Sequence, residues 1–410
     1  MKRPFSDRVA IIALLCFARL AVAAGAQDIL LSEAWNRVQA GNPSIARAAI
    51  AVRAAQALLT QGQLPPNPEL ELATEEFGRG SLEVGITLPL EIAGQRRARV
   101  RTAQAGLKAA RLEESATRLR LRAETLRRFA TALALRDQLA AADTLQALLR
   151  SSVADMSRRV AAGAARDIDR VREQLELTAL DVEAAGLRRR YDAACRSLAS
   201  LWADSSDTCR RPAGSFVIGP KLPGQAELVK LAMSQPAVIL AVNEVAAARA
   251  GLSAARADVL PAPALFGAWT RDPESGGSST RVGASLPLPV LNWNQGAVRA
   301  ARFGVAEAEW AAQQTRSDIE VQIDRLLAEL ANRSEQLDTG YSVLLPAQRR
   351  VLDDLSRHYE QGAVGVAELI AAQRVLHETT MELIESQAER VAHVADLLEI
   401  TGVEPEVIKE

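Results

Sequence analysis

The chain contains two copies of one sequence pattern, and this repeat constrains the fold more than any other feature. Pro43 in NPSIARAAIAVRAAQ matches Pro236 in QPAVILAVNEVAAARAG, and a pair of prolines follows in both copies. A Leu-Pro-Leu triplet comes next, in TLPLEIAGQRRARV and in SLPLPVLNWNQGAVRA. Further on, RRVAAGAARDIDRVREQ matches RHYEQGAVGVAELIAAQ. Landmarks that recur in the same order indicate a tandem duplication, so we expect both halves to share one fold.

The repeat sets the expected domain boundaries. We predict a first repeat over residues 27–203 and a second over residues 225–402. A linker rich in proline and glycine, residues 204–224, separates the two copies, and residues 403–410 form a C-terminal tail. Residues 1–26 have the pattern of a secretory signal, with a basic start, an apolar run and small residues at the end.

Beyond the signal, no apolar run approaches the ~20 residues that a membrane-spanning helix needs. The mature chain is therefore expected to be exported without a helical anchor. Two cysteines remain, Cys195 and Cys209. In an oxidising compartment they can form a disulfide, or one can be a buried thiol and the other an exposed thiol in the linker, and the sequence leaves both alternatives open.

Two β-hairpins are predicted, at about residues 68–90 and 263–288, because the helical periodicity there gives way to alternation. In the first hairpin the apolar side of one strand consists of Leu82, Val84, Ile86, Leu88 and Leu90. Strands of ~9–11 residues with one apolar face are typical of an outer-membrane barrel. Four strands cannot close a barrel, so several copies of the chain must share one. Small soluble hairpins packed on helices are the alternative.

Long helices follow each hairpin. A continuous helix from Gln95 to Ala162 extends ~100 Å at 1.5 Å per residue. Its heptad pattern is typical of a coiled coil, with Leu112, Leu119, Leu126 and Leu133 alternating with Ala116, Ala123 and Ala130. The returning helix repeats the seven-residue spacing at Ile168, Leu175 and Val182, which we interpret as the helix–helix seam.

Proline and glycine mark the change from strand to helix in both copies. Pro89 and Pro287 can end the strand ladder, because proline has no N–H to donate. Gly94 and Gly296 follow and allow the chain to bend into the helix.

Several functional classes are excluded by the sequence. The formal charge of −1 gives no electrostatic basis for binding nucleic acid. The chain has no nucleophile elbow, phosphate-binding glycine loop or HExxH pattern, so no enzyme activity and no cofactor are expected. The three histidines, His358, His377 and His393, lack the spacing of a metal site, and no metal ligands are predicted.

The export signal, the two helix–hairpin–long-helix copies and the phrases VAAGAARDIDRV and YEQGAVGVAELIAAQRVL resemble the outer membrane factor, or TolC-like, family. LPLEIAGQRRARV and NPELELATEE resemble the CzcC-like branch of heavy-metal efflux channels. The resemblance implies a mostly α fold with a small β part. Long antiparallel coiled-coil helices form an α-barrel, and two hairpins per chain contribute to a trimeric 12-stranded outer-membrane β-barrel.

The same resemblance implies a homotrimer in the outer membrane of a Gram-negative bacterium that extends into the periplasm. Its partners are a periplasmic adaptor (membrane fusion protein), an inner-membrane RND-type transporter and outer-membrane lipid. The channel passively exports divalent heavy-metal cations. A TolC-like channel for drugs or type I protein secretion, and a soluble periplasmic coiled-coil scaffold, are the alternatives.

Residue roles follow from the resemblance as well. Gly163 and Gly362 match the turns at the periplasmic tip, where adaptors dock. Asp169 and Glu368 match acidic residues that ring the periplasmic aperture, although the family's further acid is Ala371 here. Alternatively, both acids only favour the start of a helix, where negative charge suits the positive end of the helix dipole.

Overall fold

The first repeat contains two short helices, a hairpin and two long helices. The computed structural model describes residues 28–74, 80–203, 210–217, 222–272, 276–361 and 363–410. The elements of the first repeat are β1 (Asp28–Ile29), α2 (Leu31–Gly41), α3 (Pro43–Gly62), β2 (Glu69–Thr74), β3 (Leu82–Pro89), α4 (Gln95–Ala161) and α5 (Asp167–Ala199). The predicted signal lies outside the described residues.

The second repeat has the same order of elements. They are α6 (Gln225–Ala232), α7 (Pro236–Ala257), β6 (Ala264–Arg271), β7 (Ser278–Ser285), α8 (Gln295–Thr339), a π-helical turn (Gly340–Leu344), α9 (Leu345–Glu360) and α10 (Val366–Thr401). The described parts of the linker contain the two-residue strands β4 (Arg211–Pro212) and β5 (Ser215–Phe216), and β8 (Ile408–Lys409) lies in the tail. The mostly α fold with a small β part is confirmed.

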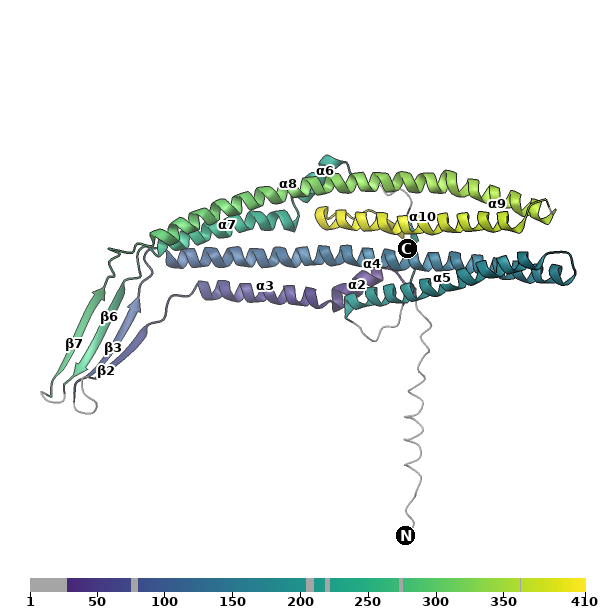
Figure 1. Ribbon diagram of the computed structural model, residues 1–410. Coiled ribbons are helices and arrows are strands. Elements are labelled where there is room, and N and C mark those ends of the chain that lie inside the picture. Colours follow the sequence, from purple (N-terminus) through teal and green to yellow (C-terminus); the bar gives the residue numbers. More distant parts are fainter. Residues whose placement is uncertain (1–27, 75–79, 204–209, 218–221, 273–275, 362) are drawn as a thin grey trace, which may run out of the picture.

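The molecule is elongated, with the strands at one end and the turns between long helices at the other (Figure 1). Helix α4 runs from the sheet to the far tip, and the predicted continuous helix is confirmed to within one residue. Near the middle, Leu126 and Leu133 of α4 are buried in a core with Phe129, Trp202 and residues of α10. The tail is held there too, because Ser32 N and Oγ donate to the Glu410 carboxylate at 2.6 and 2.7 Å.

The prediction that α5 packs against α4 through Ile168, Leu175 and Val182 is wrong. Ile168, Leu175 and Val182 are 52, 65 and 68% exposed in the chain. Helix α5 instead packs against α4 through another heptad-spaced set, Leu177, Leu180, Ala184 and Leu187. Two residues correspond to about 200° around a helix, so Leu175 and Leu177 lie on opposite faces. Both faces of α5 carry apolar residues, and the spacing alone did not show which one faces α4.

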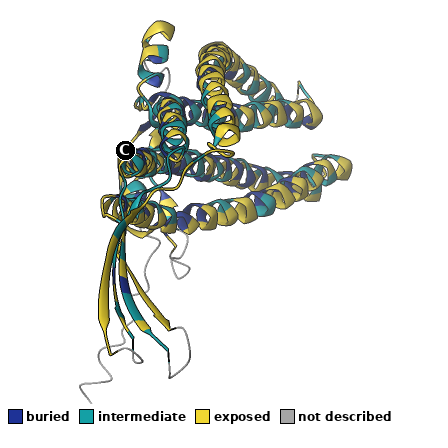
Figure 2. Cartoon of the chain, turned by 90° about the vertical axis from the view of Figure 1, so that its left-hand side faces the viewer, coloured by how far each residue is buried: buried dark blue, intermediate teal, exposed yellow. Residues whose placement is uncertain are grey.

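The four long strands form one antiparallel sheet in the order β2-β3-β6-β7. Across the sheet, Leu70 pairs with Ile86, Ile86 with Gly267, and Gly267 with Val282, so apolar side chains share one face. Leu70, Ile86 and Val282 on this face are exposed in the single chain, and the outer strands β2 and β7 are exposed along most of their length (Figure 2). On the other face Arg281 forms an ion pair with Glu83.

The strands are shorter than the predicted ~9–11 residues: β2 has 6, and β3, β6 and β7 have 8 each. Prolines limit them at the helical end of the sheet. Pro68 and Pro263 directly precede β2 and β6, and Pro89 is the last residue of β3. Pro287 lies two residues beyond the end of β7 rather than at it. Because proline cannot donate to the ladder, pairing stops near these positions.

One helix departs from the expectation that none could span a membrane. Among the described residues, α7 is long and apolar enough to do so by length and composition. It packs against α4 on one side and α8 on the other, so we place it in the helical body.

Candidate functional site

The tip of the molecule consists of two helix-to-helix turns. Between α4 and α5, Gly163 has φ +70°, and Ala164 N donates to Arg159 O at 2.8 Å. Between α9 and α10, Ala363 N donates to His358 O at 2.9 Å, the same bond across five residues. Such bonds satisfy the last carbonyls of a helix and need a residue that tolerates positive φ. Gly362 lies outside the described residues.

Asp169 and Glu368 occupy equivalent places, the third residue of α5 and of α10. Their backbone N–H groups donate to Arg166 O and Gly365 O at 3.1 and 3.2 Å. Their side chains differ. The Asp169 side chain is 14% exposed and accepts from Arg166 Nε at 3.0 Å. Glu368 is exposed, and within the described ranges no ion pair involves it. Arg166 therefore compensates the charge of Asp169, while the carboxylate of Glu368 faces solvent.

The two turns are joined by a contact that the sequence analysis missed. Arg159 Nη1 of α4 donates to the Tyr359 hydroxyl of α9 at 3.4 Å, and its guanidinium lies 5.6 Å from the ring centroid. Both residues lie close to the ends of their helices. The two turns are therefore at the same height along the molecule, as they also are in Figure 1.

Glu173 of α5 lies beside this contact and is 1% exposed. Its Oε2 has no hydrogen-bond partner among the described residues. Burial raises the pKa of Glu173, and the nearby carboxylates of Asp155 and Asp169 raise it further, whereas Ser152 and Arg159 oppose the shift. The sequence contained one signal for this buried carboxyl group: Glu173 lies on the side of α5 that faces α4.

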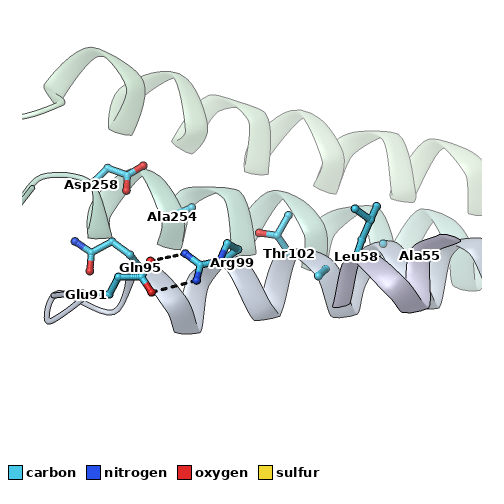
Figure 3. A pocket seen from close by; sticks show the side chains of 10 residues that line it. Ala55, Leu58, Glu91, Gln95, Arg99, Thr102, Ala254 and Asp258 are labelled. Carbon is cyan, nitrogen blue, oxygen red and sulfur yellow. Dashed lines mark hydrogen bonds and ion pairs between the residues drawn. The ribbon is translucent and has the colours of Figure 1, made fainter. Parts of the chain in front are cut away.

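At the other end, the start of α4 holds the ends of α3 and α7 (Figure 3). Gly94 has φ +88°, and the following Gln95 donates from Nε2 to Leu260 O at 2.8 Å. Arg99 donates to Leu64 O at 2.9 Å and forms an ion pair with Glu91. The hydrogen bond with Glu91 raises the pKa of Arg99. An open groove of about 770 Å³ lies over these residues.

The role expected for Gly296 is wrong. Helix α8 begins at Gln295, so Gly296 lies inside its first turn, and Asn294 takes the left-handed conformation with φ +57°. Asn294 also donates from Nδ2 to Ala255 O of α7 at 2.9 Å. Asparagine tolerates this conformation better than most residues, because its short polar side chain can hydrogen-bond locally.

The remaining candidates are dispersed. His377 lies 3.2 Å from Glu183, and His393 lies 3.3 Å from Glu329. Across the part of the chain that the structure describes, no three His, Cys, Asp or Glu side chains are grouped to hold a metal ion. Cys195 is disulfide-bonded. Cys209 lies outside the described residues, so its pairing with Cys195 stays a prediction.

The chain is similar in sequence and in fold to known proteins. The family model described as "Outer membrane efflux protein" matches residues 34–204 and 228–403. The cobalt-zinc-cadmium resistance protein CzcC of Cupriavidus metallidurans is 22% identical over 365 residues, which cover 88% of this chain and 86% of that protein.

Solved structures of similar fold include CusC, with a TM-score of 0.78 at 16% identity, covering 94% of this chain and 96% of that one. VceC from Vibrio cholerae has a TM-score of 0.74 at 17% identity, with coverage of 91% and 96%. The Neisseria gonorrhoeae MtrE channel has a TM-score of 0.75 at 20% identity, with coverage of 91% and 88%.

Proposed function

The chain belongs to the outer membrane efflux protein family, and from this premise we propose that it forms a homotrimeric outer-membrane channel through which a tripartite pump exports divalent heavy-metal cations. Localisation in the outer membrane and a role in efflux follow from the family. The number of copies, the partners and the cargo are the proposal. We assign no catalytic role to any residue.

The observation that carries the proposal is the four-stranded sheet at the end of the long helices. Its outer strands β2 and β7 each leave one edge unpaired among the described residues of the chain. Unpaired backbone groups cannot remain exposed to hydrocarbon, so β7 of one copy must pair with β2 of the next. Three copies provide 12 strands, and the exposed apolar face that contains Leu70, Ile86 and Val282 then contacts lipid.

The proposed roles in the periplasm belong to the tip of the long helices. We assign the turn at Gly163, and the segment of sequence between α9 and α10 that contains Gly362, to docking of a periplasmic adaptor, which connects the channel to an RND-type transporter in the inner membrane. Asp169 and Glu368 lie in the first turn of the helix that follows each of these segments, and we assign them to the aperture. The exposed carboxylate of Glu368 supports this assignment more strongly than that of Asp169, which Arg166 compensates.

The identity of the cargo is the most specific part of the proposal. The similarity to a cobalt-zinc-cadmium resistance protein over most of both chains supports divalent metal cations. A passive conduit needs no binding site for its cargo, so drugs or secreted proteins are the alternative. A soluble periplasmic scaffold is disfavoured because one face of the sheet exposes several large apolar side chains, among them Leu70, Ile86 and Val282.

Deletion of the gene in its host tests the cargo. We expect greater sensitivity to zinc, cobalt or cadmium, restored by the intact gene, with unchanged sensitivity to hydrophobic drugs. The protein should fractionate with the outer membrane and have the mass of a trimer in detergent. Drug sensitivity without metal sensitivity would reassign the cargo, and a stable monomer with full strand content would contradict the trimer.

A further inference from the structure

Two exposed apolar stripes follow the outer faces of the periplasmic helices. On α5 the stripe contains Leu175, Ala179 and Val182, on the face opposite the buried contact with α4. On the other repeat it contains Leu344, Ala347 and Val351, at the end of the π-helical turn and on α9. Both stripes alternate large and small side chains at spacings of three and four residues, which is the pattern of a coiled-coil seam. The described residues of the chain cover neither stripe.

The two stripes lie on faces of α5 and α9 that take no part in the packing of the chain. In the periplasmic half, α5 packs against α4 and also contacts α10, through Glu176 with Arg374 and Glu183 with His377. Helix α9 packs against α10 and contacts α4 through Tyr359 and Arg159. These contacts leave the two stripes exposed, so in a closed ring of identical copies α5 of one copy can meet α9 of the next.

The stripes also match in height. At 1.5 Å per residue, Leu175 lies about 12 Å from the start of α5, and Val351 lies about 13 Å from the end of α9. Val182 and Leu344 lie about 22 and 24 Å from the same ends. The tips are level within the chain, because Arg159 contacts Tyr359. Rotation about an axis parallel to the helices does not change height, so the stripes stay level between copies.

We propose that α5 of one copy and α9 of the next form an antiparallel zipper in one register. The rungs pair residues of like size or opposite charge: Leu175 with Val351, Ala179 with Ala347, Val182 with Leu344, and Arg172 with Asp354. The rung nearest the tip, Ile168 with His358, is mixed. This inference rests on the proposed trimer and adds the surface and the register by which its copies meet below the sheet.

The charged rung gives the register its specificity. The Arg172 and Asp354 side chains are 51 and 64% exposed. Within its own chain Arg172 lies 3.8 Å from Asp169, and Asp354 pairs with Arg357 one turn away. A shift by one heptad, about 10 Å, would place Asp354 against Ala179 or Arg172 against Ala347, which leaves a charge facing an apolar side chain.

Cysteine pairs test the register. Leu175→Cys and Val351→Cys, introduced together and oxidised in isolated outer membranes, should form disulfides between copies and give covalent dimers and trimers on a non-reducing gel. The control combines Val182→Cys with Val351→Cys, which is shifted by one heptad. A disulfide needs Cβ atoms about 3.5–4.5 Å apart, so the shifted pair should not cross-link. Each single variant controls for the native cysteines.

Charge reversal provides a second test. Arg172→Asp should lower the temperature at which the trimer dissociates, and adding Asp354→Arg should restore it. Within one chain the double variant places a new carboxylate beside Asp169 and a new guanidinium beside Arg357, so only a pair between copies explains the rescue. Arg158→Asp, on α4 and outside the stripe, should not be rescued by Asp354→Arg.

The outcomes separate this inference from the proposed function. A protein that is trimeric by mass but cross-links equally or better through the shifted pair would overturn the register and leave the channel intact. A trimer that forms no disulfide through the matched pair and shows no charge rescue would also overturn the zipper. A protein that is monomeric in detergent and absent from the outer membrane would contradict the proposed function itself.

Discussion

At the scale of single residues, the repeat equivalence of Asp169 and Glu368 hides an electrostatic difference. Both occupy the third position of a helix, where a negative charge suits the positive end of the dipole. Arg166 pairs with Asp169, however, while Glu368 is exposed. The position of the two acids in the repeat gives no sign of this difference. Its local cause is that residue 166 is arginine in the first repeat and residue 365 is glycine in the second.

We therefore predict that Glu368→Ala reduces the cation selectivity of the purified channel more than Asp169→Ala does. Three copies of Glu368 place three uncompensated carboxylates around the passage, and their summed field favours cations. Reversal potentials in planar bilayers under a salt gradient measure this, as does block by trivalent cations from the periplasmic side. Glu335→Ala, at an exposed site on α8, is the control. Equal effects of both tip variants would mean that Arg166 does not shield Asp169.

Glu173 gives a prediction about pH. Its pKa in the folded chain is raised, chiefly by burial, so the folded state binds more protons than the unfolded state just above the ordinary glutamate pKa. Stability from this group is present below the unfolded pKa and falls as pH rises toward the folded pKa. A buried polar atom without a partner costs about 1–3 kcal/mol. We expect Glu173→Gln to raise the melting temperature at pH 7 and to have little effect at pH 4.

Thermal unfolding of detergent-solubilised protein at both pH values measures the effect of Glu173→Gln. Glu176→Gln is a control on the same helix, because Glu176 is paired with Arg374 and should lose stability when neutralised. A Glu173→Gln variant that is destabilised at pH 7 would show that the carboxylate is ionised and compensated in the folded protein.

At the scale of elements, the sequence predicted the features that depend on local interactions, such as the position of helices and hairpins. It missed the features that depend on tertiary contacts, such as the packing face of a helix. The bounds of α4 and the positions of the two hairpins along the chain followed from periodicity and from proline, although the strands are shorter than predicted. The seam on α5 was misassigned, because Leu175 and Leu177 both belong to heptad-spaced apolar sets. The bend before α8 is at Asn294 and not at the predicted Gly296, because α8 begins at Gln295 and Gly296 is already helical. Arg159, Glu173 and Tyr359 come together only because two distant turns are level.

The α4–α5 turn provides a test at this scale. Gly163 has φ +70°, and no atom of the described residues lies within 4 Å of a Cβ added there. Gly163→Val therefore causes conformational strain without a clash, about 1–3 kcal/mol. We expect the trimer to assemble normally and cross-linking to the adaptor to fall. Ala164→Val, at the adjacent exposed position, is the control. Wild-type adaptor cross-linking in Gly163→Val would remove this turn from the docking surface.

At the scale of the whole molecule, the proposed trimer makes the chain one segment of a ring. Its sheet ends in the unpaired edges of β2 and β7, and its periplasmic helices end in the apolar stripes of α5 and α9, as far as the described residues extend. At the two junctions, Gly94 and Asn294 take the left-handed conformation where the chain turns into the long helix. A single copy leaves both kinds of edge exposed, so hydrogen bonding in the sheet and apolar burial in the helices favour the same closed assembly.

The sheet must then present its apolar face to lipid, and two neighbouring residues of β3 test this. Ile86 is 57% exposed on the apolar face, while Thr87 pairs with Glu69 and Phe266 on the opposite face. Arginine on the lipid side of a barrel costs about 2–4 kcal/mol at mid-membrane. We expect Ile86→Arg to lower the yield of trimer in the outer membrane and Thr87→Arg to leave it near wild type, measured by fractionation and unheated gels. Because the two sites are adjacent in one strand, they share depth and backbone pairing and differ only in face. The reverse order of yields would place lipid on the side of Arg281 and Glu83, and equal yields would remove this strand from the membrane.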